Sequence, residues 1–126
     1  MRQLVLAVFV GVAISAVMSA VDYALMPAQG IVWPAWYGPF RTLSEAFLTV
    51  GPGVVAGWMA GRKGWLVGAA VGGCVTLLSL AILPFVWGPI SPSIVFKTLI
   101  FGGMATVLTH SVAGAAGELL KTRAAP

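Results

Sequence analysis

The chain has 126 residues, of which 60% are hydrophobic and only 8% are charged, and its mean hydropathy is +1.01. Soluble domains carry about 25% charged residues, so this composition excludes a water-soluble globular domain and predicts a surface that faces lipid. The net charge of +4 does not indicate nucleic-acid binding, because the basic residues flank apolar segments and form no patch with interleaved aromatics. The single cysteine, Cys74, excludes an intrachain disulfide and a cysteine metal cluster, and we interpret it as a packing residue.

Four apolar segments predict an all-α, integral membrane four-helix bundle of two antiparallel helical hairpins in a single transmembrane domain. The expected helices cover about residues 4–26, 43–61, 65–83 and 92–117. The first resembles a signal peptide at its start, with Arg2 before an apolar run, but the run continues to Val21 and predicts an uncleaved helix. Asp22 lies within about 20° of Ser15 around this helix, and so on its packed side. That side carries small residues at Ala7, Gly11, Ser15 and Ser19.

The segment Pro27–Phe40 is predicted to be a loop rich in proline, glycine and aromatic residues. Trp33, Trp36 and Tyr37 suit a membrane interface, where one edge of an aromatic ring is hydrated. A lid over a ligand is the alternative role for this loop.

The second helix is predicted to begin with a capping box, in which Thr42 is the N-cap and Glu45 follows three residues later. Near its middle lies the sequence Gly51-Pro52-Gly53. Proline removes one helical hydrogen bond and glycine permits a bend, so a helix break is expected here. Such a break marks the binding site of some transporters, and the alternative is a kink that is simply packed.

A helical hairpin is predicted over Gly51–Gly73, with a tight basic turn at Arg62-Lys63. Glycines recur every fourth residue on both sides of the turn, which places them on one face of each helix. Because residues equally far from a tight turn lie at the same height, we expect these two glycine faces to oppose each other in the closest helix contact of the fold. The glycines are Gly53, Gly57 and Gly61 before the turn, and Gly64, Gly68 and Gly72 after it.

The same hairpin carries a family resemblance. Its sequence, running from Gly53 to Gly68, is similar to the G-x-x-A-G-x-x-A-G-R-x-G-W-L-x-G hairpin of small four-helix bacterial inner-membrane proteins of unknown function. The resemblance implies a four-helix bundle in a bacterial inner membrane. It implies no activity and no functional residues.

The fourth helix is predicted to start at Ser91-Pro92, with serine as cap and proline in the first turn, and to leave residues 118–126 as a polar tail. Four spans place both termini on one side of the membrane. The basic residues on that side outnumber those on the other, so the positive-inside rule predicts that both termini are cytoplasmic. The inner residues are Arg2, Arg62, Lys63, Lys121 and Arg123, and the outer ones are Arg41 and Lys97.

Four ionisable residues fall near the outer interface and form a candidate polar cluster: Asp22, Arg41, Glu45 and Lys97. We expect the Asp22 carboxylate to lie within salt-bridge reach of Arg41 or Lys97, because an unpaired carboxylate on a packed face would lose solvation without compensation. Lys97 shares an apolar face with Phe101, Met104 and Leu108, a pattern that favours a lysine extending along lipid to water.

His110 is the only histidine in the chain. Its helix face carries small residues at Gly103, Thr106, Gly114 and Gly117. Such a face suits the packing of a neighbouring helix, or alternatively the flat macrocycle of haem or chlorophyll with His110 as its ligand. His110 lies near the inner side while Asp22 and Glu45 lie near the outer side, so no hydrolytic triad can form at one depth, and no nucleotide-binding motif is present.

These patterns favour a non-enzymatic membrane protein without metal or cofactor. Its expected role is structural: an accessory or assembly subunit that packs through glycine-rich faces, either as a homo-oligomer or in a larger membrane complex. One alternative is a small transporter or channel with the Gly51–Gly53 break as its gate. Another is a pigment- or haem-carrying subunit that uses His110.

Overall fold

The computed structural model describes residues 1–24, 35 and 37–124 and is helical throughout its regular structure. Four helical segments are long and apolar enough to cross a membrane, and they pack against each other. The predicted all-α four-helix bundle is therefore confirmed, and the chain is a small integral membrane protein. The fourth span combines three consecutive pieces. The elements are α1 (Arg2–Ala24), α2 (Tyr37–Ala60), α3 (Gly64–Trp87), α4 (Pro92–Lys97), the π-helix η1 (Thr98–Gly103) and α5 (Met104–Ala124).

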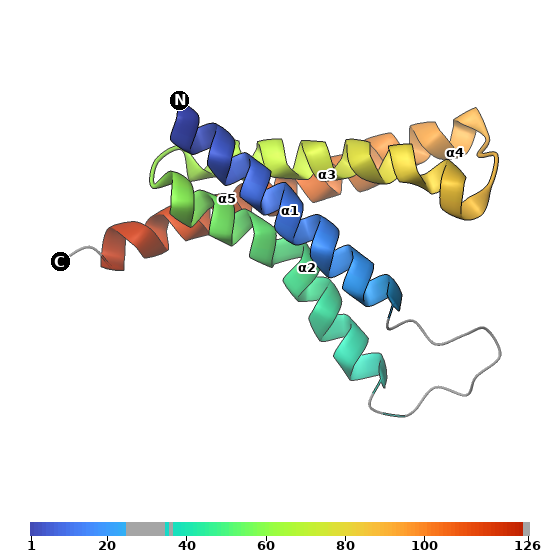
Figure 1. The fold of residues 1–126 in the computed structure, drawn as a ribbon, viewed down its shortest axis with the longest axis horizontal. Coiled ribbons are helices and arrows are strands. Elements are labelled where there is room, and N and C mark those ends of the chain that lie inside the picture. Colours follow the sequence, from blue (N-terminus) through green and yellow to red (C-terminus); the bar gives the residue numbers. More distant parts are fainter. Residues whose placement is uncertain (25–34, 36, 125–126) are drawn as a thin grey trace.

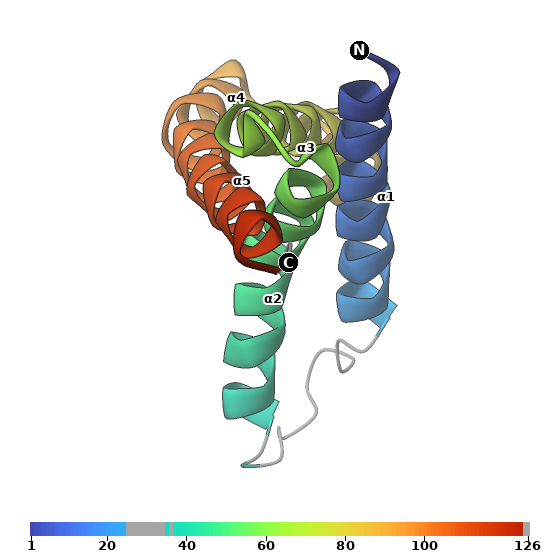
Figure 2. The same cartoon turned by 90° about the vertical axis from the view of Figure 1, so that its left-hand side faces the viewer.

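The helices form three layers. α2 and α3 lie in the middle, with α1 packed against both on one side and α5 packed against both on the other (Figure 2). α1 and α2 form one antiparallel pair, and α3 forms the other with the chain from α4 to α5 (Figure 1). The two pairs meet near the turn that joins α2 to α3 and diverge toward their opposite ends (Figure 1). We call the end that holds this turn the turn end, and the diverging ends the two arms.

The start of α2 differs from the prediction. The helix begins at Tyr37, so Thr42 lies inside it and its hydroxyl donates to the Gly38 carbonyl oxygen at 3.1 Å. The predicted capping box of Thr42 and Glu45 is therefore wrong. The earlier start is physically reasonable, because Pro39 falls in the first turn, where a missing N–H costs no helical hydrogen bond. The aromatic loop residues Trp33 and Trp36 lie outside the described residues.

Prolines do not interrupt the membrane helices. α2 is continuous through Gly51–Gly53, and the Pro52 side chain is fully buried. α3 passes through Pro84 to Trp87 rather than ending at Leu83, and it closes at Gly88, whose φ of 77° requires glycine and whose N–H donates to the Pro84 carbonyl. Neighbouring helices allow membrane helices to tolerate proline. The expected break in α2 is a packed stretch of helix.

The fourth span starts as predicted and ends later. Pro92 occupies the first turn of α4, and Ser91 precedes it in the extended conformation. α5 then runs to Ala124, so residues 118–124 of the expected polar tail are helical. This extension brings Glu118 and Lys121 back against the turn between α2 and α3.

The helix side chains divide into a small buried set and a large apolar surface. The core between α1, α2 and α3 consists of Ala7, Ala56, Ala60, Val67 and Val71. Of the small residues predicted on the packed side of α1, Ser19 is exposed and the others are buried. Cys74 is also exposed, so it is not the packing residue that we expected. Among the described residues, the buried polar side chains are Ser15 and His110.

Candidate functional site

The glycines of α2 and α3 pack against α5. A Cβ atom placed on Gly57 would lie 2.7 Å from the Cα atom of Gly114, and one placed on Gly68 would lie 2.7 Å from the carbonyl carbon of His110. Cβ atoms essentially never come this close to backbone atoms, so only glycine fits at either position. The expectation that the two glycine faces oppose each other in the closest helix contact is therefore wrong. Both faces hold α5 in the notch between α2 and α3.

The contact face of α5 is also built from small residues. A Cβ on Gly114 would lie 3.0 Å from the Cα of Gly68, and a Cβ on Gly117 would lie 2.8 Å from the backbone nitrogen of Trp58. The predicted small face around His110 thus packs against two helices at once, which confirms the packing interpretation of that face. Close approach of backbones increases van der Waals contact, a main source of helix association where lipid removes the hydrophobic drive.

His110 lies inside this notch with its side chain 1% exposed. The imidazole Nδ1 lies 2.8 Å from the Thr106 carbonyl oxygen. A carbonyl only accepts, so Nδ1 donates to it. Nε2 is buried and has no hydrogen-bond partner among the described residues. In this arrangement the ring has no open side that could receive a macrocycle, so the geometry favours helix packing over the haem or chlorophyll hypothesis.

A polar clamp joins α5 to the turn end. The Gly64 N–H, at the start of α3, donates to the Glu118 carboxylate at 2.6 Å. Lys121 Nζ donates to the Met59 carbonyl near the end of α2 at 3.4 Å, and Gln3 Nε2 of α1 donates to the same carbonyl at 3.3 Å. We call these five residues the turn clamp.

The turn clamp matches side-chain charge to helix ends. A carboxylate near the N-terminus of α3 and an ammonium near the C-terminus of α2 both interact favourably with the helix dipoles. The turn clamp was not predicted, because Glu118 and Lys121 were expected to lie in a polar tail. Their spacing of three residues, which puts both on one side of a helix, was the available signal.

The structure separates one member of the candidate polar cluster, Lys97, from Asp22. Asp22 accepts a hydrogen bond from the Ser44 hydroxyl at 3.3 Å. Within the described residues it forms no salt bridge with Lys97, which belongs to the other arm (Figure 1). The side chain of Arg41 lies outside the described residues, so that half of the prediction is untested. Glu45 is exposed on α2, and its backbone carbonyl accepts the hydroxyl of Thr49.

Lys97 lies on a surface that suits lipid. It is exposed at the end of α4. The apolar residues predicted to share its face, Phe101, Met104 and Leu108, are all exposed as well. The expected apolar stripe below Lys97 is thus present, although the π-helix η1 lies within it.

No protein-family model, no curated protein and no solved structure matches this chain. The resemblance of the hairpin sequence to small bacterial inner-membrane proteins therefore stays a prediction. The described residues contain no group of three or more histidine, cysteine, aspartate or glutamate side chains that could hold a metal ion. What the site offers is close helix packing, one enclosed imidazole and a polar clamp at the turn end.

Proposed function

We propose that this protein is a non-catalytic accessory or assembly subunit of a bacterial inner-membrane complex. The observation that carries the proposal is how α5 is held. Backbone contacts at Gly57, Gly68 and Gly114 fill the notch between α2 and α3 with α5, so packed helices occupy the interior of the bundle. A rigid, filled bundle suits a protein that presents its outer surface to another membrane protein.

The glycine faces are not the surface offered to a partner, because they are used within the chain. A homo-oligomer built on those faces would have to displace α5. The better candidate surface is the part of α2 beyond its crossing with α5. Val50 lies seven residues before Gly57 and Leu43 lies fourteen before it, so all three are on the same side of α2. The side chains of Leu43 and Val50 are 63% and 43% exposed. We call Leu43, Ala46 and Val50 the α2 arm face. A transmembrane helix of a partner protein would cover it.

Site-specific photo-cross-linking in the native membrane tests this role. A photoreactive amino acid at Leu43 or Val50 is expected to form an adduct with a second membrane protein. A matched control at Phe9 lies on an exposed face of α1 and is expected to yield lipid adducts only. Identification of the same partner protein by mass spectrometry from both α2 positions supports the role. Lipid adducts only, or adducts only between copies of this chain, would overturn it.

We also propose that both termini are cytoplasmic. The support is the distribution of charge: Arg2, Arg62, Lys63 and Arg123 belong to segments that meet at the turn end, whereas Lys97 lies in an arm (Figure 1). Reporter fusions after residue 124 and within residues 27–36 test the orientation. A C-terminal reporter that is active only outside the cytoplasm would contradict the proposal.

A further inference from the structure

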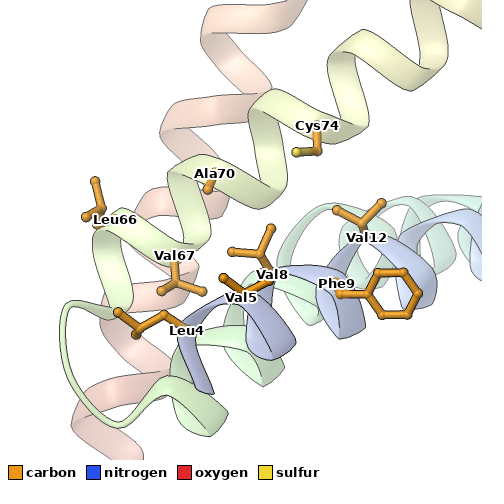
Figure 3. A pocket seen from close by; sticks show the side chains of 9 residues that line it. All are labelled: Leu4, Val5, Val8, Phe9, Val12, Leu66, Val67, Ala70 and Cys74. Carbon is orange, nitrogen blue, oxygen red and sulfur yellow. The ribbon is translucent and has the colours of Figure 1, made fainter. Parts of the chain in front are cut away.

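A groove between α1 and α3 opens onto the lipid-facing surface (Figure 3). Its volume is about 490 Å³ and its lining is almost wholly apolar. The floor consists of Val8, Val12 and Val67, which pack against or belong to the buried core. Exposed residues of α3, among them Ala70 and Cys74, form one rim. The groove exists because α1 and α3 both start at the turn end and diverge from there (Figure 1).

The length of the groove matches one leaflet of a bilayer. It extends from Leu4 to Val12 along α1 and from Leu66 to Cys74 along α3. Eight residues of helix span about 12 Å, and half of the hydrocarbon core of a bilayer is about 15 Å thick. An apolar groove of this length fits a single acyl chain that enters from the leaflet at the turn end.

Basic side chains stand at the turn end of this groove. Arg2 is exposed and lines a hollow that shares Val5 and Phe9 with the groove. Arg62 and Lys63 are exposed in the turn that precedes α3, the helix on which Leu66 begins the groove. The acid at this end, Glu118, accepts from the Gly64 N–H, and its single negative charge does not balance the three basic residues.

We propose that this groove is a binding site for an anionic phospholipid, with one acyl chain along Val8 and Ala70 and the headgroup phosphate at Arg2, Arg62 and Lys63. The apolar groove alone would accept any lipid tail. The three cations add a preference for a headgroup with net negative charge over a zwitterionic one. The site is separate from the α2 arm face, and it binds lipid whether or not a partner protein binds that face.

Photo-cross-linking with defined lipids tests the site on the whole chain in nanodiscs. The probes are phosphatidylglycerol and phosphatidylcholine with the same diazirine-bearing acyl chain, and peptide mapping locates the adducts. Phosphatidylglycerol is expected to label the groove around Val12 and Cys74 several times more than phosphatidylcholine. Neutralising all three cations with Arg2→Gln, Arg62→Gln and Lys63→Gln should abolish this preference. Lys97→Gln, in an arm, should leave it unchanged.

A second pair of variants tests the acyl-chain part. Ala70 is exposed in the groove, and Ala81 is exposed on α3 outside it. A larger side chain at either position therefore lies on the protein surface and not in the buried core. Ala70→Phe should abolish groove labelling by both lipids, whereas Ala81→Phe should not change it. Equal labelling by the two lipids in the original chain would overturn the proposal. A preference that survives loss of all three charges, or groove labelling that survives Ala70→Phe, would overturn it as well.

Discussion

The two faces of the α2–α3 layer hold their partner helices in different ways. On one face, Gly57 and Gly68 bring α5 so close that an added Cβ would overlap backbone atoms. On the other face, Gly11 of α1 is the glycine in close contact, and an added Cβ there would first meet the Val71 side chain at 2.7 Å. The α5 contact is therefore backbone to backbone, and the α1 contact is largely side chain to side chain.

This difference determines which contacts can adapt to a substitution. A side chain can change its rotamer to accommodate one extra methyl group, but a helix backbone can only move as a whole. The α5 face also carries the turn clamp, in which Glu118 and Lys121 bind two helix ends. We expect α5 to be fixed rigidly in its notch and α1 to tolerate substitution.

The largest effect is expected from glycine on the α5 face. Gly68→Ala should lower the free energy of unfolding by about 3 kcal/mol, because the new Cβ overlaps the His110 backbone. Gly73→Ala is the matched control: it lies five residues away on α3, and a Cβ there meets no atom within 4 Å. Unfolding by denaturing detergent, followed by circular dichroism, measures both. Equal stability of the two variants would contradict the account of the α5 face.

The next effect concerns the turn clamp. Glu118→Ala should cost about 1–2 kcal/mol, because the Gly64 N–H at the start of α3 loses its acceptor. Glu118→Gln keeps an acceptor oxygen and should cost less. Hydrogen exchange of the first turn of α3 should be faster in the alanine variant than in the glutamine variant. Unchanged exchange in both would show that the carboxylate does not hold this helix end.

A smaller effect is expected on the α1 face. Gly11→Ala should cost about 1 kcal/mol, because the added methyl group presses against the Val71 side chain. Shortening that side chain by Val71→Ala in the same protein should relieve part of this cost. A double-mutant cycle measures the coupling between the two positions. If Gly11→Ala lowered the free energy of unfolding as much as Gly68→Ala, the distinction between the α1 face and the α5 face would be lost.

The smallest effect is expected at the far end of α1. Asp22→Asn should change the free energy of unfolding by less than about 1 kcal/mol, because asparagine keeps an oxygen that accepts from the Ser44 hydroxyl. Ser44→Ala removes the donor and serves as the comparison. A cost above about 2 kcal/mol for Asp22→Asn would indicate that the carboxylate charge itself holds the two helices together.

Sequence reasoning predicted the four spans because long apolar segments with few charges have one stable form in lipid. It also placed the glycines of α2 and α3 on one face of each helix. It did not predict which helix those faces contact, because periodicity defines the face of a helix and not the neighbour beyond it. Height matching across a tight turn suggested a pairing of Gly57 with Gly68, but both contact α5 instead.

Local sequence rules failed where a longer-range contact or an earlier start decided the outcome. The Thr42 and Glu45 pattern matches a capping box, yet Pro39 allows α2 to begin before it. Glu118 and Lys121 were expected to belong to a polar tail, because their hydrogen-bond partners lie more than fifty residues away in the chain. The small face around His110 indicated helix packing, but an Nε2 with no partner among the described residues could not be foreseen.

The glycines of α3 hold the backbone of α5, and a single interatomic distance reports this contact. His110 is the only histidine, so labelling histidine with a ¹³C carbonyl marks a single site on α5. An added Cβ on Gly68 would lie 2.7 Å from that carbonyl carbon, which places the Gly68 Cα within about 4.3 Å of it.

Solid-state NMR of the chain in lipid bilayers, with ¹³Cα-labelled glycine, measures this distance. We predict a strong cross peak between the His110 carbonyl carbon and the assigned Gly68 Cα, in addition to the peak from Gly114 on the same helix. A spectrum in which the His110 carbonyl correlates with glycine of its own helix alone would contradict the account.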